Sequence, residues 1–158
     1  MNKKLKRYIS LFFIITLTSC SYKPIFSEKN YNFEINEILF TGEKYVNRII
    51  ESKFNLIKEE QSKNKKKYNI SIQTKKEKLI VSKDSKGDPL KFDLVVSAYY
   101  EISNNGKLLL NKRIQKNSIY NNEIDKFKLE QSEKIILDNL SKEISETIIS
   151  SIINLDDN

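Results

Sequence analysis

The run from Phe92 to Ile102 constrains the fold more than any other segment of the chain. Its large apolar side chains fall at every second position: Phe92, Leu94, Val96, Ala98, Tyr100 and Ile102. A period of two predicts a strand with one buried face. Asn105-Gly106 follows closely, and this dipeptide tolerates the positive φ angles of a tight hairpin turn. The segment 108–118 is therefore predicted to return antiparallel beside the first strand.

Two further strands are predicted before this hairpin. The first covers residues 33–40, with Phe33, Ile35 and Leu39 on one face and Glu37 interrupting the pattern. The second covers residues 68–74, which alternate cleanly. Leu79, Ile80 and Val81 are expected to extend it past a charged interruption. Residues 84–89 are predicted to form a turn, and the lysine-rich segment 61–67 is predicted to be an exposed loop.

Two segments show the helical period instead. Residues 43–60 place one apolar stripe at Val46, Ile49, Ile50, Phe54 and Ile57. Residues 122–153 repeat aliphatic side chains every four positions, at Ile136, Leu140, Ile144, Ile148 and Ile152, flanked by Leu137, Ile149 and Ile153. Asn122 or Asp125 would cap the start of this helix.

The order of these elements is strand, helix, three strands, helix. It predicts an α+β fold in which two helices pack on one face of a mostly antiparallel four-stranded sheet. The other face would be half polar and would carry Val95, Tyr99 and Ile119. These three side chains are either ordinary exposed residues or a surface that docks against a partner.

The first twenty residues have the layout of a secretory leader. Lys3, Lys4, Lys6 and Arg7 precede an apolar run that is too short to span a bilayer as a helix. The run ends in Leu17-Thr18-Ser19-Cys20, which resembles a bacterial lipobox, and Cys20 is the only cysteine. We therefore predict a lipoprotein signal peptide at 1–19, a tether lipidated at Cys20 over 20–32, and one domain over 33–155. Two or three acyl chains at Cys20, palmitate among them, would anchor the protein stably.

Several classes of function are made improbable by composition. The chain has no histidine, so it has no Ser-His-Asp or Cys-His arrangement and lacks the usual zinc ligands. Its three glycines form no phosphate-binding pattern. We expect that the protein is not an enzyme and that it binds neither a metal ion nor a cofactor. The net charge of +7 comes largely from the leader, and export argues against nucleic acid as a partner.

The mature region resembles the lipopolysaccharide-assembly lipoprotein family LptE. The local resemblance lies in Cys20, Tyr22, Pro24, Ile25 and Phe26, although Ser21 stands where glycine is usual in the family. A second match is Ser118-Ile119-Tyr120, followed by the long C-terminal helix. Ser21 after the cysteine, rather than Asp, is consistent with sorting to the outer membrane.

The resemblance implies a single LptE-like α+β domain and a non-catalytic function. Such a protein would be an outer-membrane lipoprotein that faces the periplasm, plugs the lumen of the large barrel protein LptD, helps it assemble, and binds lipopolysaccharide for insertion into the outer leaflet. By element and turn, the lipopolysaccharide-binding positions would be Lys83 and Lys86 between the second and third strands. Lys126 and Lys128, near the start of the last helix, would join them.

An alternative function remains for the same pattern. A lipid-anchored periplasmic module could hold a small ligand or a peptide between its sheet and helices, with no connection to lipopolysaccharide. The four lysines would then be ordinary solvated side chains, which are common in a chain this rich in lysine.

Replacing the lipidation site tests the leader assignment. We expect Cys20→Ser to abolish palmitate incorporation and to mislocalise the protein, while leaving the domain folded because the tether lies outside the predicted core. Radiolabelled palmitate, cell fractionation and a thermal melt measure these outcomes. A markedly lower melting temperature would contradict the separation of tether and domain.

Overall fold

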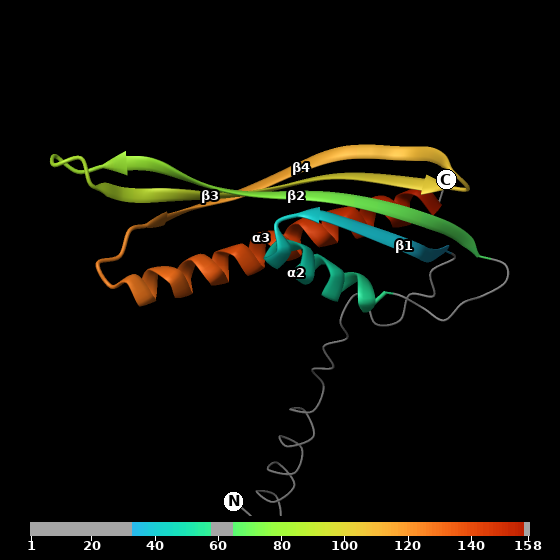
Figure 1. Ribbon diagram of the computed structural model, residues 1–158, viewed down its shortest axis with the longest axis horizontal. Helices are drawn as coiled ribbons and strands as arrows, with labels where there is room; N and C mark the ends of the chain where they lie inside the picture. The colour runs from blue at the N-terminus through green and yellow to red at the C-terminus, as the bar shows by residue number, and fades with distance from the viewer. Residues whose placement is uncertain (1–32, 58–64, 157–158) are drawn as a thin grey trace, which may run out of the picture. The chain divides into compact units, whose positions relative to one another are not determined.

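The computed structural model describes residues 33–57 and 65–156. Within them the chain forms six elements (Figure 1): β1 Phe33–Gly42, α2 Lys44–Asn55, β2 Lys66–Lys83, β3 Pro89–Asn104, β4 Lys107–Asn121 and α3 Lys126–Asp156. The predicted α+β class and element order are confirmed. The leader 1–19, the tether 20–32 with Cys20, and residues 58–64 lie outside the described residues.

The sheet has the order β1-β2-β3-β4. β2, β3 and β4 form an antiparallel meander, whereas β1 lies parallel to β2. β2 is one strand of 18 residues, so the predicted pieces 68–74 and 79–81 are joined without a break. It already begins at Lys66, so Lys66 and Lys67 lie in a strand and not in the predicted loop, although both are exposed as predicted.

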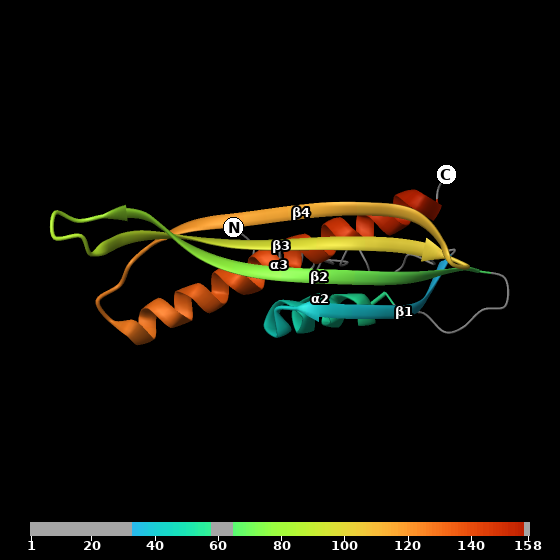
Figure 2. The ribbon, with the colours of Figure 1, turned by 45° about the horizontal axis from the view of Figure 1, so that its top comes forward.

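Both helices cover the same face of the sheet (Figures 1 and 2). The predicted apolar face of β3 is buried from Leu94 to Ile102, and it faces the aliphatic stripe of α3, in which Leu140, Ile144, Ile148 and Ile152 are buried. α2 adds Val46, Ile50, Phe54 and, just beyond its end, Ile57. One continuous apolar core therefore lies between the sheet and the two helices.

The first strand departs from its predicted alternation. β1 pairs regularly with β2 as far as Ile35, and the register then shifts between Ile35 and Glu37. Such a β-bulge reverses which side chains face inward. Ile38 and Phe40 pack against the core, whereas Leu39 is exposed. The prediction that Leu39 shares a face with Phe33 and Ile35 is therefore wrong, because it continues the same alternation past the interruption at Glu37.

The outer face of the sheet also differs in part from the expectation. Val95 is only 6% exposed, whereas Tyr99 and Ile119 are exposed. Glu77 and Asn117 lie opposite Val95 on the neighbouring strands, and their longer side chains flank it on the same face. Val95 is therefore shielded within the sheet and is not part of an open apolar row.

Local interactions fix the turns. Asn105 and Gly106 both have positive φ angles, as expected for the predicted hairpin turn. Gly42 also has a positive φ, and a Cβ there would lie 1.9 Å from the carbonyl oxygen of Thr74, so the turn from β1 into α2 requires glycine.

The start of α3 is capped by Asp125. Its Oδ1 accepts hydrogen bonds from the backbone N–H groups of Phe127 (3.0 Å) and Lys128 (3.3 Å). Asn122, the other predicted cap, instead donates to the carbonyl of Pro89 (2.8 Å). Among the described residues, no helix combines the length and the apolar character needed to cross a membrane.

Truncation of one α3 side chain tests the packing. Leu140 is 5% exposed in the middle of the buried stripe, whereas Ile135 on the same helix is 60% exposed. We expect Leu140→Ala to lower the free energy of unfolding by about 2–5 kcal/mol, because it leaves a cavity. Ile135→Ala, the matched control, should change it by less than about 0.5 kcal/mol. Chemical denaturation measures both, and equal effects would show that the helix faces are misassigned.

Candidate functional site

The two central strands extend past the end of β1. β1 ends at Gly42, opposite Thr74, and beyond this point β2 and β3 continue as a hairpin. We call residues 75–97 the arm (Figures 1 and 2). β4 accompanies the arm on one side, and the first turns of α3 start near it on the helix-covered face. The arm and these turns form the distal end of the domain.

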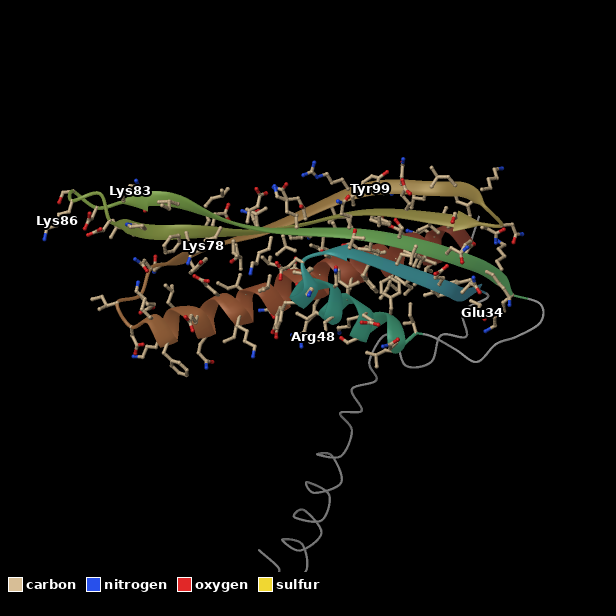
Figure 3. The ribbon with its side chains drawn as sticks, viewed as in Figure 1. Glu34, Arg48, Lys78, Lys83, Lys86 and Tyr99 are labelled. Carbon is tan, nitrogen blue, oxygen red and sulfur yellow. The ribbon has the colours of Figure 1, made fainter. Side chains whose placement is uncertain are left out.

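One polar network ties the arm to α3. Lys78 forms a hydrogen-bonded salt bridge with Glu133, and the hydroxyl of Tyr120 donates to the same carboxylate oxygen at 2.7 Å. The Lys78 ammonium also lies 4.0 Å from the centre of the Phe92 ring (Lys78 is labelled in Figure 3). Lys78 is therefore held by a carboxylate and an aromatic face together.

The network perturbs the acidity of two of its members. Partial burial opposes ionisation of Glu133, but the hydrogen bonds from Lys78 and Tyr120 and the charges of Lys78 and Lys76 outweigh it, and the pKa of Glu133 is lowered. Burial, followed by the hydrogen bond to Glu133, raises the pKa of Tyr120. At neutral pH the carboxylate is ionised and the phenol remains a donor.

A cleft of about 390 Å³ lies between the arm and α3. Its apolar floor includes Leu94 and Leu137, and the residues around it are Tyr45, Lys76, Lys78, Glu130, Glu133 and Lys134. Tyr45 is fixed by a hydrogen bond of 2.7 Å to Asp138. The cleft thus combines an apolar floor with a charged rim, which suits an amphiphile.

Exposed apolar side chains gather on the same end of the domain. They come from both strands of the arm, from the end of β4 and from the start of α3: Leu79, Ile80, Val81, Leu90, Ile119, Ile124, Phe127 and Ile135. Ile124 is fully exposed and Phe127 is 68% exposed. A concentration of this kind marks an interaction surface.

The four lysines predicted to bind lipopolysaccharide all lie at this end and are all exposed. Lys83 ends β2 and Lys86 lies in the turn at the tip of the arm (Figure 3), where Asp84 accepts hydrogen bonds from the backbone N–H groups of Lys86 and Asp88. Lys126 and Lys128 lie in the first turn of α3. The structure therefore places the two pairs on one end of the domain but on separate elements.

Three basic residues at the cleft were not predicted. In the sequence, Lys76 and Lys78 interrupt the apolar pattern that predicts the strand, and Lys134 lies outside the aliphatic repeat that predicts the helix. Lys76 and Lys78 continue the sequence Ile70, Ile72 and Thr74, which all face the helices. The unbroken period of two across this segment was the signal that could have identified them.

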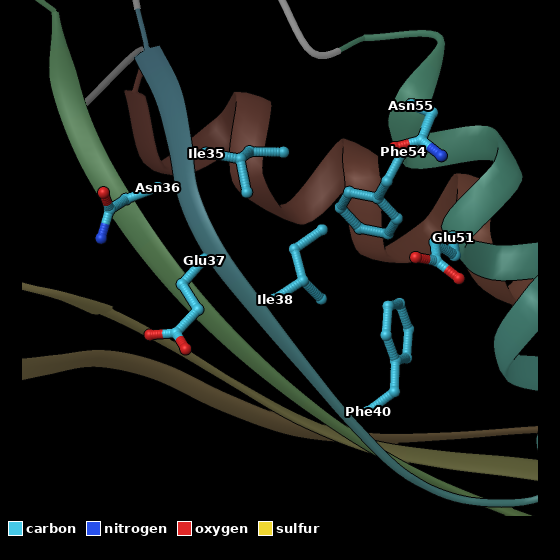
Figure 4. Close-up of a pocket in the computed structure, with 8 residues that line it drawn as sticks. All are labelled: Ile35, Asn36, Glu37, Ile38, Phe40, Glu51, Phe54 and Asn55. Carbon is cyan, nitrogen blue, oxygen red and sulfur yellow. The ribbon is translucent and has the colours of Figure 1, made fainter.

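A smaller cavity of about 120 Å³ lies between β1 and α2 (Figure 4). Ile35, Ile38 and Phe40 point from β1 towards Phe54, whereas Asn36 and Glu37 point away, as the bulge requires. Its size leaves room for little more than a few water molecules. Within residues 33–57 and 65–156, no group of three acidic, histidine or cysteine side chains could hold a metal ion.

Comparison with known proteins identifies the fold. No protein-family model matches the chain, and no curated protein sequence matches it. Solved structures do match. Rare lipoprotein B from Shewanella oneidensis has a TM-score of 0.54 at 14% identity, over 76% of this chain and 98% of that one. An uncharacterized lipoprotein B from Nitrosomonas europaea has a TM-score of 0.58 at 15% identity, over 77% and 85%.

A minor lipoprotein from Acinetobacter baumannii matches with a TM-score of 0.51 at 12% identity, over 75% of this chain and 92% of that one. All three matches cover most of both chains. The domain therefore has the fold of these bacterial lipoproteins.

The Lys78–Glu133 network predicts a dependence of stability on pH. The pKa of Glu133 lies below its ordinary value of 4.5, so the ionised network stabilises the folded state at neutral pH and this contribution is lost as the pH falls below about 4.5. We expect Glu133→Gln to lower the free energy of unfolding by about 1 kcal/mol at pH 7. The difference from the wild type should shrink at pH 3.5. A difference that stays constant with pH would exclude this role for the charge.

Proposed function

We propose that the protein is an outer-membrane lipoprotein of the LptE type, which binds lipopolysaccharide and helps to assemble and plug an LptD-like barrel. The observation that carries the proposal is the distal end, where lysines surround exposed apolar side chains in a domain with the fold of bacterial lipoproteins. The predicted lipidation of Cys20 and the leader are consistent with it.

The distal end has the chemistry that lipid A requires. Lipid A carries phosphates next to acyl chains, so its receptor needs cations close to apolar surface. Lys83 and Lys86 stand beside Val81 and Leu90 on the arm, and Lys126 and Lys128 flank Phe127 on α3. The cleft behind them adds Lys76 and Lys134 over an apolar floor.

The outer face of the sheet suits a polar barrel lumen. Amide and hydroxyl side chains dominate it, among them Asn69, Ser71, Gln73, Ser97, Tyr99, Asn111, Gln115 and Asn117. The same face also carries Lys75, which pairs with Glu77, and Arg113, which lies opposite Tyr99. The lumen of an outer-membrane barrel is itself polar and can receive such a face. The hydroxyl of Tyr99 already donates to Glu101 at 2.7 Å, which fixes the ring on this face.

Charge reversal at the four lysines tests lipid binding. We expect the full-length protein to bind lipid A, and the variant with Lys83, Lys86, Lys126 and Lys128 all changed to Glu to bind at least about tenfold more weakly, because phosphates lose their charge-assisted hydrogen bonds. A matched control changes four exposed lysines elsewhere to Glu (Lys44, Lys107, Lys112 and Lys142) and should bind nearly as the wild type.

Two outcomes would contradict the proposal. Equal loss in both variants would show that only net charge matters, and absence of lipid A binding by the wild type would favour the alternative ligand- or peptide-binding module.

Co-purification tests the proposed partnership with the barrel protein. A tagged protein should co-purify from solubilised membranes with a large barrel protein. Clean recovery as a free monomer would count against that part.

A further inference from the structure

The arm leaves one edge of β2 without a neighbouring strand. The N–H of Glu43 donates to the carbonyl of Thr74 (3.3 Å), so the backbone groups of Thr74 point towards β1. Backbone groups alternate in direction along a strand, and β2 pairs regularly with β3 as far as Ile80. Lys76, Lys78 and Ile80 therefore direct their N–H and C=O groups to the side where β1 has ended. In the described part of the chain no strand lies there (Figure 2).

The part of β2 that lacks a neighbouring strand on this side is apolar and exposed. Leu79, Ile80 and Val81 are consecutive, favour the strand conformation, and are each about half exposed (51%, 51% and 49%). Edge strands of soluble proteins are normally short, bulged or covered. Here the edge is straight from Thr74 to Ile80, and the bulge comes only after it, between Ile80 and Ser82.

Charge decides which occupant fits. Lysines flank the apolar run on both sides, at 75, 76 and 78 and again at 83, against Glu77 alone. Lys78 is paired with Glu133 and Lys75 with Glu77, but among the described residues Lys76 and Lys83 have no salt bridge. A second copy paired antiparallel about Ile80 would place Lys83 of each chain opposite Glu77 of the other, and Lys76 opposite Asp84. Glu77 already pairs with Lys75, and Asp84 already accepts hydrogen bonds from the backbone of the turn. A partner that brings its own carboxylates therefore suits Lys76 and Lys83 better than a second copy does.

We propose that the β2 edge over residues 75–83 accepts an extended segment of another protein as an added strand, and that this segment is apolar in the middle and acidic at its ends. Main-chain hydrogen bonds from Lys76, Lys78 and Ile80 supply the affinity, and Lys76 and Lys83 select the acidic flanks. The added strand occupies the row that β1 fills beside the first half of β2. This inference does not depend on lipid binding.

Hydrogen exchange on the full-length protein tests the edge directly. The probe is a capped peptide of alternating valine and threonine with two aspartates at each end. Without it, the amides of Lys76, Lys78 and Ile80 should exchange rapidly and those of Lys75, Glu77 and Leu79, which face β3, slowly. Saturating peptide should slow the three outward amides at least about tenfold and leave the inward ones unchanged. Absence of this protection would overturn the proposal.

Substitutions distinguish peptide binding through backbone hydrogen bonds from binding through the apolar side chains alone. Ile80→Pro or Lys76→Pro removes one outward N–H and should weaken peptide binding about tenfold, whereas Ile80→Val keeps the N–H and should bind as the wild type. A control peptide with lysine in place of aspartate should bind the wild type at least about tenfold more weakly. Equal affinity for both peptides would overturn the charge assignment.

Protection of the outward amides without peptide, accompanied by dimer formation, would assign the edge to a second copy and overturn the proposal. Peptide binding should persist when Lys126 and Lys128, which lie on α3 outside this edge, are changed to Glu, so a failure at the edge is distinguishable from a failure of lipid binding.

Discussion

The structure depends on one interface, where the aliphatic stripe of α3 lies against the alternating apolar face of β3. Leu140, Ile144 and Ile148 fall on one side of the helix because they repeat every four residues, and Leu94 to Ile102 fall on one side of the sheet because they repeat every two. The two periods meet between Leu137 and Ile152 of the helix and between Leu94 and Ile102 of the strand. The neighbouring strands and α2 add the other buried side chains of the core around this interface.

The cover supplied by the helices is incomplete at the distal end, and the surface chemistry follows from this. Where α2 and the middle of α3 cover the sheet, side chains such as Tyr100 and Ile102 are fully buried. Along the arm, the same face of β2 carries Lys76 and Lys78. Lys78 pairs with Glu133, to which Tyr120 also donates, and the charge of Lys76 acts on the same carboxylate. An apolar core there would be open to water, so a polar network and a charged cleft take its place.

Periodicity predicted the elements from the sequence, but it did not predict their irregularities. Residues 92–102 and the α3 repeat were assigned correctly because each obeys a single period over its whole length. The sequence predicts Leu39 on the wrong face because one extra residue in β1 reverses the alternation. The interruption at Glu37 marks the position of that bulge but does not by itself show that the faces are exchanged. Lys78 was missed because its carboxylate partner lies 55 positions away, a pairing that only the fold creates.

The parallel pairing of β1 with β2 has a consequence for the order of assembly. The meander of β2, β3 and β4 forms between neighbours joined by short turns, so little loop-closure entropy opposes it. β1 reaches β2 only through a crossover that contains α2, with Phe33 opposite Lys66. We therefore expect the first strand to be the last to join the sheet. Until it does, β2 offers a free hydrogen-bonding edge along its entire length, and a nascent chain is exposed to mispairing during this interval.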